Sequence, residues 1–99
     1  MSFTIEFDPK ADKEYFDAWD WYENQSVGLG DRFGNVLLKQ VQSISKDPFA
    51  YPNKKSNFRE SKVVDFPFLI LYKIYPAKNL IYITSIFHTS RNPKKKYRK

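Results

Sequence analysis

The chain has 99 residues, of which 41% are hydrophobic and 18% aromatic, and it carries a formal net charge of +6. This length predicts a single domain over residues 1–99, with a small core that aromatic side chains can fill. The chain contains no cysteine, which excludes disulfide bonds and thiolate metal sites. No apolar run approaches the roughly 20 residues that a membrane-spanning helix requires, so we expect a cytoplasmic protein without membrane contact.

Charge is divided unevenly along the chain. Residues 1–31 carry eight acids and two bases, a net charge of −6, whereas residues 54–99 carry twelve bases and two acids, a net charge of +10. A basic half of this kind attracts a polyanion or an acidic protein and raises the rate of encounter with either. The same pattern also describes a solvated surface that keeps a protein soluble, so both interpretations stand.

The first part of the chain predicts a short strand followed by a helix. Residues 3–7 alternate apolar and polar side chains, as a half-buried strand does. Asp8 and Pro9 then predict a helix start, because the Asp8 carboxylate can accept from exposed backbone amides and proline needs no amide partner there. The helix is expected to reach about Ser26, with an apolar stripe of Ala11, Tyr15, Ala18, Trp19 and Tyr22. Trp21 falls off this stripe and is expected either to pack on the next helix, the favoured interpretation, or to contact a partner.

A glycine-rich break predicts the turn into a second helix. Gly28 and Gly30 end the first helix, and Asp31 is expected to cap the second, which runs to about residue 46. Its apolar stripe consists of Phe33, Leu37, Val41 and Ile44. The two helices should form an antiparallel hairpin, and residues 48–57, with two prolines and no periodicity, should form a loop.

The carboxy-terminal half predicts three strands in a meander. A short polar run, residues 58–65, stops at Pro67, which cannot donate to a strand ladder. Residues 68–75 and 80–88 alternate along their length and should pair across a short turn. Alternation in the last strand places His88 on one face together with Leu80, Tyr82, Thr84 and Ile86. The predicted fold is α+β, with a helix hairpin covering one face of a small, mainly antiparallel sheet and the other face partly open.

His88 and Arg91 are the candidate catalytic residues. His88 is the only histidine, and imidazole exchanges protons near neutral pH, while Arg91 three residues later can hold a phosphate by a forked contact. Together they supply half of a metal-free phosphodiester site, which needs a base, an acid and cations. A lone histidine at a strand end serves a structural role about as often. Spacings of metal ligands, a nucleophile elbow and a phosphate-binding glycine loop are absent from the sequence, so we expect no metal and no cofactor.

Two further groups of residues are candidates for binding phosphate or a target. Arg59 and Lys62 lie on the polar strand, where they can contact phosphate or simply protect a sheet edge. The basic tail, residues 92–99, interleaves Tyr97 with Lys94, Lys95 and Lys96, a pattern that suits base stacking together with phosphate contact. The alternative is a solvated tail, mobile in isolation.

The order of these elements, and the motifs within them, resembles the RelE/ParE superfamily of bacterial type II toxins. In chain order the motifs are Asp8-Pro9-Lys10-Ala11, Tyr22-Glu23-Asn24-Gln25-Ser26, Gly28-Leu29-Gly30, Phe33, Pro52 ahead of Arg59, Phe66-Pro67-Phe68, Ile70-Leu71-Tyr72 and Phe87-His88-Thr89-Ser90-Arg91-Asn92-Pro93. The resemblance covers nearly the whole chain. It implies a small α+β toxin that a co-expressed antitoxin wraps and neutralises, and that acts on translation or on DNA gyrase.

The resemblance divides between two branches of the superfamily. Ribonuclease members similar to RelE or YoeB usually carry an arginine three positions before the strand tyrosine that Tyr72 matches, and this chain has Leu69 there. His88 matches the strand-end histidine of YoeB-like members, and Tyr97 stands near a terminal aromatic at a different spacing. The Phe-Pro-Phe motif and the His-x-x-Arg-x-Pro ending look more like the ParE, or plasmid-stabilisation, branch.

The resemblance therefore favours a ParE-like toxin that inhibits DNA gyrase by binding and arrests growth. One alternative is a ribosome-dependent, metal-independent mRNA endonuclease, in which His88 carries a proton and Arg91 clamps a phosphate. A second alternative is a detoxified relative kept as a basic binding module. If the protein is a toxin, the basic half and the open sheet face should form the surface on which its cognate antitoxin docks.

Overall fold

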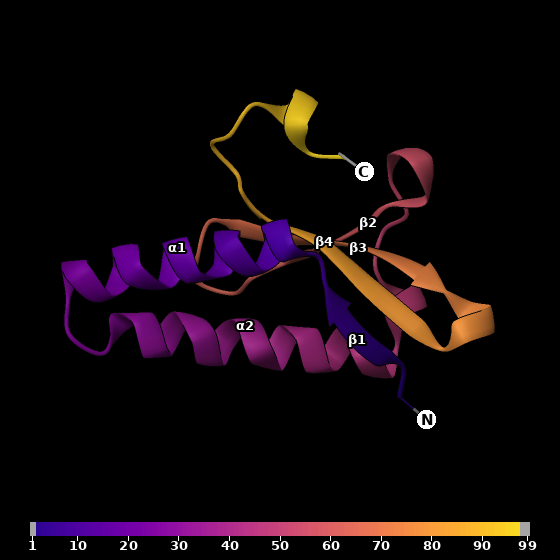
Figure 1. Ribbon diagram of the computed structural model, residues 1–99, viewed down its shortest axis with the longest axis horizontal. Coiled ribbons are helices and arrows are strands. Elements are labelled where there is room, and N and C mark those ends of the chain that lie inside the picture. Colours follow the sequence, from indigo (N-terminus) through magenta and orange to yellow (C-terminus); the bar gives the residue numbers. More distant parts are fainter. Residues whose placement is uncertain (1, 98–99) are drawn as a thin grey trace.

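The computed structural model describes residues 2–97 (Figure 1). Its helices and strands are β1 Thr4–Phe7, α1 Pro9–Gln25, α2 Leu29–Lys46, β2 Arg59–Lys62, β3 Phe68–Tyr75 and β4 Leu80–His88. Short 3₁₀ turns lie at Pro48–Ala50, Lys55–Asn57, Pro76–Lys78 and Pro93–Lys95. The predicted α+β order of strand, two helices and three strands is confirmed, although β2 is shorter than the polar run that predicted it.

The sheet has the strand order β1-β4-β3-β2. β2 and β4 each pair antiparallel with β3, whereas β1 lies parallel to β4, with Thr4 opposite Leu80. Parallel neighbours need a crossover connection, and the helix hairpin between β1 and β2 begins that crossover. The prediction of a mainly antiparallel sheet is confirmed. Because β1 adds to the far side of β4, both β3 and β4 are central strands.

An irregularity between β3 and β4 changes which side chains of β4 face the helices. Leu71 pairs with Ser85 and Tyr72 pairs with Ile83, so Thr84 is an extra residue on β4. A bulge of this kind reverses the alternation beyond it. As a result Ile86 shares the helix-side core with Ile81 and Ile83. The predicted face for His88, shared with Tyr82 and Thr84, is wrong for this reason: His88 turns toward α1.

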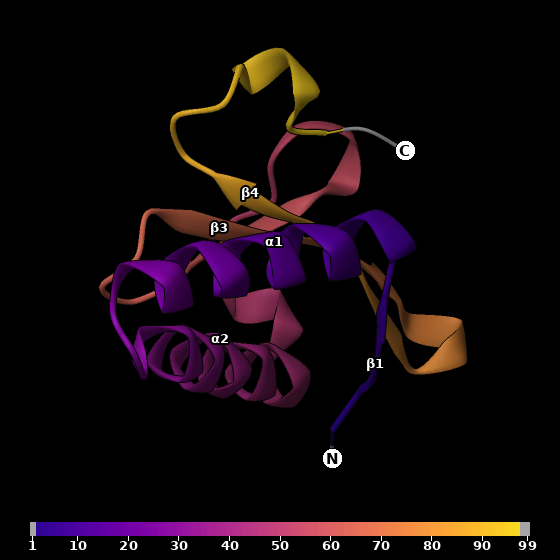
Figure 2. The ribbon, with the colours of Figure 1, turned by 60° about the vertical axis from the view of Figure 1, so that its left-hand side comes forward.

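The two helices lie together on one side of the sheet, and the segment after β4 lies on the other (Figures 1 and 2). The predicted stripes of both helices are confirmed, because their members are buried in the core or packed against it. The helix-side core consists of Ala11, Ala18, Phe33, Leu37, Val41, Ile44, Val63, Phe66, Phe68, Ile70, Tyr72, Ile81, Ile83 and Ile86. Asp8 caps α1 as predicted, accepting from the Lys10 backbone N–H at 2.8 Å.

The turn between the helices differs from the prediction in how it is capped. α2 begins at Leu29, and Asp31 lies within its first turn, not at its cap. Glu23 of α1 supplies the cap instead, because its carboxylate accepts from the backbone N–H groups of Gly28 and Gly30 at 3.0 Å. A negative charge at a helix N-terminus also interacts favourably with the helix dipole. Gly28 has a φ of 89°, a conformation that glycine adopts without strain.

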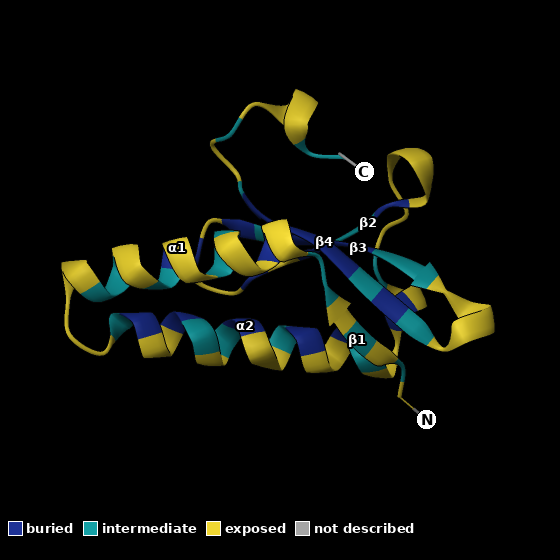
Figure 3. Cartoon of the chain, viewed as in Figure 1, coloured by how far each residue is buried: buried dark blue, intermediate teal, exposed yellow. Residues whose placement is uncertain are grey.

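The face of the sheet away from the helices is covered, which corrects the prediction of an open face. Phe58, Leu71 and Phe87 are buried outside the helix-side core. The Tyr97 ring packs on Phe58 with 5.4 Å between ring centroids. In Figure 3 the central strands are largely buried, whereas the outer sides of both helices are exposed. The basic tail thus serves as part of the cover, at least up to residue 97; residues 98 and 99 of the predicted tail lie outside the described residues.

Tyr72 connects the sheet to the loop that follows α2. Its hydroxyl donates to the Pro48 backbone carbonyl at 2.7 Å, and the side chain is fully buried. Burial raises the pKa of Tyr72, because the phenolate would lose its hydration. This strand tyrosine, which belongs to one of the family motifs, therefore holds the chain in place at the start of the loop.

Candidate functional site: a groove at the end of β4

A groove of about 380 Å³ lies between α1 and the end of β4. Its walls combine apolar and ionisable side chains, namely Glu14, Asp17, Ala18, Trp21, Tyr22, Phe68, Ile86, His88 and Arg91. Both candidate catalytic residues, His88 and Arg91, line it. The favoured prediction, that Trp21 packs on the second helix, is wrong: its side chain is 59% exposed and stands edge-on to Tyr22 beside the groove.

Glu14 organises one wall of the groove. Its Oε1 accepts from the Ser85 hydroxyl at 2.9 Å and from the Ile86 backbone N–H at 3.1 Å, while Oε2 forms an ion pair with Arg91. The Glu14 side chain is 17% exposed, so this carboxylate is largely withdrawn from water. The bulge at Thr84 matters here, because it orients this part of β4 toward α1. Arg91 is therefore already neutralised, and its guanidinium also lies over the Phe87 ring.

His88 is held by the turn that follows β4. Its Nδ1 accepts from the Ser90 backbone N–H at 3.0 Å and lies 2.7 Å from the Ser90 hydroxyl. A backbone N–H can only donate, so Nδ1 carries no proton, and the neutral ring has its hydrogen on Nε2. The ring also stands edge-on to Phe68. In this arrangement neither ring nitrogen is free to accept a substrate proton, and His88 offers the groove a hydrogen-bond donor.

Arg59 and Lys62, predicted together as phosphate contacts, point to opposite sides of β2. Arg59 donates to the Tyr51 backbone carbonyl at 2.6 Å and stacks on Phe49, so it anchors the loop after α2. Lys62 is exposed. Three positions along a strand reverse the face of the side chain, which explains the separation. Arg59 has a structural role here, and only Lys62 remains available to a partner.

The tail residues lie over β2, apart from the groove. Glu60 accepts from the Tyr97 hydroxyl and pairs with the Lys96 ammonium at 2.9 Å. Burial alone would raise the pKa of Glu60, but the hydrogen bonds from Tyr97 and Lys96, together with nearby Lys54, hold it below its usual value. Burial and the bond to Glu60 raise the pKa of the Tyr97 hydroxyl. The predicted base-stacking role of Tyr97 would require it to leave Phe58.

Sequence reasoning missed two residues that shape the groove and the tail contact, Glu14 and Glu60. The two carboxylates are single acids that meet cations far along the chain, and no local spacing marks such pairs. Trp21 had a signal, since it lies off the apolar stripe of its helix, and that position is also consistent with an exposed side chain. Within residues 2–97 no group of three His, Cys, Asp or Glu side chains is placed to hold a metal ion, and no helix is long and apolar enough to span a membrane.

Comparison with solved structures identifies the class of fold. The chain is similar to the chromosomal ParDE toxin-antitoxin system from P. aeruginosa, with a TM-score of 0.74 and 15% identity over 90% of this chain and 98% of that chain. It is similar to the intact E. coli RelBE toxin-antitoxin complex, with a TM-score of 0.64 and 18% identity over 91% of this chain and 100% of that one. The isolated E. coli RelE toxin matches at 0.64 with 16% identity, over 96% and 93% of the two chains. The protein thus has the fold of RelE/ParE superfamily toxins.

A family model identifies the branch. Residues 5–93 match the ParE toxin of the type II toxin-antitoxin system parDE. This match spans most of the chain, so the protein belongs to the ParE toxin family. Comparison with curated protein sequences finds no match. The predicted membership of the RelE/ParE superfamily, in its ParE-like branch, is confirmed.

Proposed function

We propose that this ParE-family toxin arrests growth by binding DNA gyrase and not by cleaving RNA. The observation that carries the proposal is the ion pair between Glu14 and Arg91. A phosphate clamp in a ribonuclease needs a cation that faces the substrate, and here the one arginine of the groove is bound to a carboxylate of the protein itself. Leu69, half-buried on β3, stands where ribonuclease relatives usually have a further arginine.

The arrangement of His88 supports the same proposal. With Nδ1 occupied by the Ser90 backbone N–H, the ring lacks a free acceptor and cannot take a proton from an attacking hydroxyl. The groove does offer what a binding site needs, because Trp21 is exposed beside an apolar floor of Phe68 and Ile86. Exposed tryptophans next to such pockets are frequent anchors in protein interfaces.

Supercoiling assays with purified gyrase and relaxed plasmid test this proposal. The wild-type toxin should inhibit supercoiling, and Trp21→Ala should weaken inhibition about tenfold, as expected when an interface anchor is truncated. Tyr75→Ala, which removes an exposed ring at the distant β-hairpin end, is the matched control and should inhibit like the wild type. Absence of inhibition by the wild type at large molar excess would exclude gyrase as the target.

The second candidate is a ribosome-dependent mRNA endonuclease, favoured by one observation: His88 and Arg91 line the same groove. Growth after induction in the absence of the antitoxin separates the two. Translation arrest that disappears in His88→Gln, with cleavage of ribosome-bound message by the wild type, would favour the nuclease. Arrest of DNA synthesis that survives His88→Gln would favour gyrase. Unimpaired growth with folded protein would identify a detoxified binding module.

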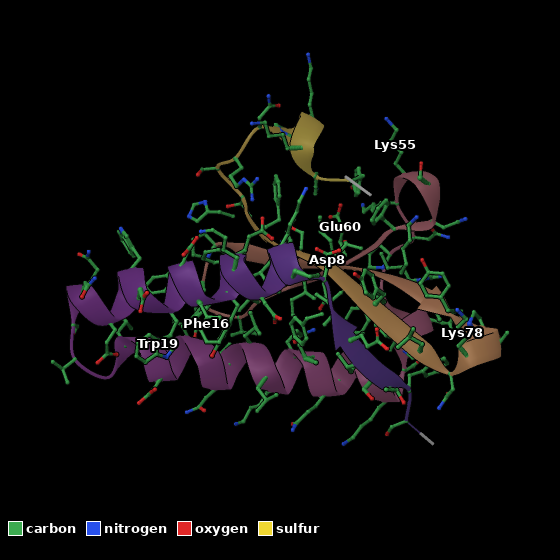
Figure 4. The ribbon with its side chains drawn as sticks, viewed as in Figure 1. Asp8, Phe16, Trp19, Lys55, Glu60 and Lys78 are labelled. Atoms are coloured by element: carbon green, nitrogen blue, oxygen red, sulfur yellow. The ribbon has the colours of Figure 1, made fainter. Side chains whose placement is uncertain are left out.

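We also infer that a cognate antitoxin binds this chain, since the family is defined by toxin-antitoxin systems. With one sheet face covered by the tail, exposed apolar surface is found on the helix hairpin, where a groove of about 320 Å³ includes Phe16 and Leu38. Figure 4 shows Phe16 and Trp19 directed toward the space between α1 and α2. Co-purification with a co-expressed cognate antitoxin should fail in a Phe16→Asp variant and persist in Val27→Asp, an exposed control. Retention by both would place the interface elsewhere.

A further inference from the structure

Five exposed lysines form a surface that the proposed function does not use. We call this surface the lysine face, and it consists of Lys54, Lys55, Lys62, Lys94 and Lys95. None of the five is in an ion pair within residues 2–97. The segments that carry them come from two separate parts of the chain, namely the loop before β2 together with β2 itself, and the 3₁₀ turn Pro93–Lys95.

The fold brings these segments to one side of the sheet. The loop that contains Lys55 and the segment after β4 lie side by side in both views, on the side of the sheet opposite α2 (Figures 1 and 2). Lys62 is two residues from Glu60 along β2 and therefore shares its face, toward the tail. Lys54 lies close enough to Glu60 to lower its pKa. Figure 4 shows Lys55 and Glu60 near the tail.

Glu60 holds the tail portion of this surface in place. It is the acceptor for the Tyr97 hydroxyl and the ion-pair partner of Lys96, and its side chain is only 10% exposed. Tyr97 adds a ring contact with Phe58. These contacts come directly after Lys94 and Lys95, so they hold in place the chain segment from which those two side chains project. The ion-pair partner of Glu60 is Lys96, and none of the five exposed lysines forms an ion pair with Glu60.

We propose that the lysine face binds the phosphate backbone of duplex DNA, with Glu60 as a positioning residue. DNA carries a negative charge about every 1.7 Å along its axis, so clustered lysines gain affinity by releasing condensed counterions. The acidic residues of α1, including Asp12 and Asp20, are exposed and would be repelled by DNA, which favours an approach to the lysine face. An acidic protein is the less suitable partner, because residues 54–62 and 92–97 expose no large apolar side chain and Val64, exposed beyond Lys62, is too small by itself to form an interface core.

Fluorescence anisotropy with a labelled 20-base-pair DNA duplex and the full chain tests the proposal. We expect a dissociation constant in the range of about 1–100 μM near physiological salt, and a log–log slope of affinity against salt near −4.5 for five phosphate contacts. Replacing Lys54 and Lys55 together by glutamine should reduce the magnitude of the slope by about 1.8. The same replacement of Lys39 and Lys46, exposed on α2, is charge-matched and should leave the slope unchanged.

Several outcomes would overturn the proposal. Absence of binding at about 100 μM protein in low salt would do so, as would equal slopes for the two double variants. Comparable binding of an RNA duplex is expected for recognition of a phosphate backbone, whereas binding of RNA alone would exclude DNA as the ligand. Binding of polyglutamate without binding of DNA would assign the face to an acidic protein. The assay contains no gyrase, so its failure leaves the proposed toxin target untouched.

A positioning role of Glu60 and the net charge of the protein predict opposite effects of Glu60→Gln on the affinity for DNA. Glu60→Gln raises the net charge by one, yet it should weaken DNA binding about threefold because the tail lysines lose their fixed position. Asp65→Asn, which removes the exposed partner of Arg32, adds the same charge and should bind DNA as well as or better than the wild type. Circular dichroism confirms folding of both variants. Tighter binding by Glu60→Gln, equal to that of Asp65→Asn, would show that Glu60 has no positioning role.

Discussion

The two faces of the sheet are covered in different ways. On the helix side, two amphipathic helices bury a continuous core in which Phe33 touches the rings of Tyr15, Tyr22, Phe66 and Phe68. On the tail side, a few apolar residues are covered by segments that individual polar contacts hold in place. One face is therefore stabilised by many interchangeable apolar contacts, and the other by a small number of specific polar contacts.

The largest expected loss of stability comes from a substitution in the helix-side core. Phe33→Ala should lower the free energy of unfolding by about 4 kcal/mol, because it removes a fully buried ring and leaves a cavity among the surrounding rings. Urea denaturation gives the value. The control is Phe16→Ala, whose ring is 59% exposed and whose loss should cost less than about 0.5 kcal/mol. Equal losses for the two variants would contradict the picture of a packed helix-side core.

A substitution in the groove between α1 and β4 should have the next largest effect on the free energy of unfolding. Glu14→Ala should cost about 2 kcal/mol, because it removes the carboxylate that accepts from the Ile86 backbone N–H and from the Ser85 hydroxyl. Asp17→Ala on the same helix breaks only an exposed pair with Lys13 and should cost at most about 0.5 kcal/mol. Thermal and urea unfolding of both variants measure the difference. If Glu14→Ala loses no more unfolding free energy than Asp17→Ala, Glu14 does not stabilise the contact between α1 and β4.

The tail cover should have a smaller effect on stability. Tyr97→Ala is expected to cost about 1 kcal/mol, from the lost ring contact with Phe58 and the lost hydrogen bond to Glu60. Tyr75→Ala, at an exposed position, is the control and should be nearly neutral. Hydrogen exchange should rise around β2 in Tyr97→Ala without a change in α1 or α2. A loss as large as that of Phe33→Ala would make the tail part of the main core.

The smallest expected effect is the pH dependence of the tail contact. The folded pKa of Glu60 is lowered, so the ionised carboxylate stabilises the folded state. This contribution is fully present above the unfolded pKa, near about 4.3, and is lost as the pH falls through the folded value. The difference in unfolding free energy between wild type and Glu60→Gln should therefore be constant at higher pH and shrink below about pH 4. A difference in unfolding free energy that stays constant down to about pH 3 would contradict the lowered pKa of Glu60 in the folded state.

The fold was predictable where periodicity carried the information. The stripes of α1 and α2 and the alternation in β3 predicted which side chains form the core, because apolar burial depends on a repeating pattern. The partner of β1 was not predictable from its four residues, and neither was the bulge at Thr84, because both depend on how distant strands meet. The cap of α2 was mispredicted because Asp31 has the right chemistry locally, yet Glu23 reaches the same amides from the preceding helix.

The candidate site was predictable in part. His88 and Arg91 are close in sequence and necessarily lie together, and the structure places both in one groove. The chemistry open to His88 and Arg91 depends on their contacts with Ser90 and Glu14, respectively. No sequence motif predicts these contacts. Arg59 was grouped with other cations by charge alone, whereas its carbonyl partners in the loop after α2 make it a structural residue.

The α+β order, the two apolar helix stripes, the separation of charge and the toxin family follow from the amino-acid sequence, because they depend on local composition, spacing and motifs. The parallel pairing of β1, the direction of His88, the neutralisation of Arg91 and the docking of the tail on Glu60 are visible only in the folded chain. Each of these depends on contacts between residues distant in the chain. Such contacts depend on individual atoms that meet at hydrogen-bond distance, and the hydrophobic periodicity of the sequence does not predict them.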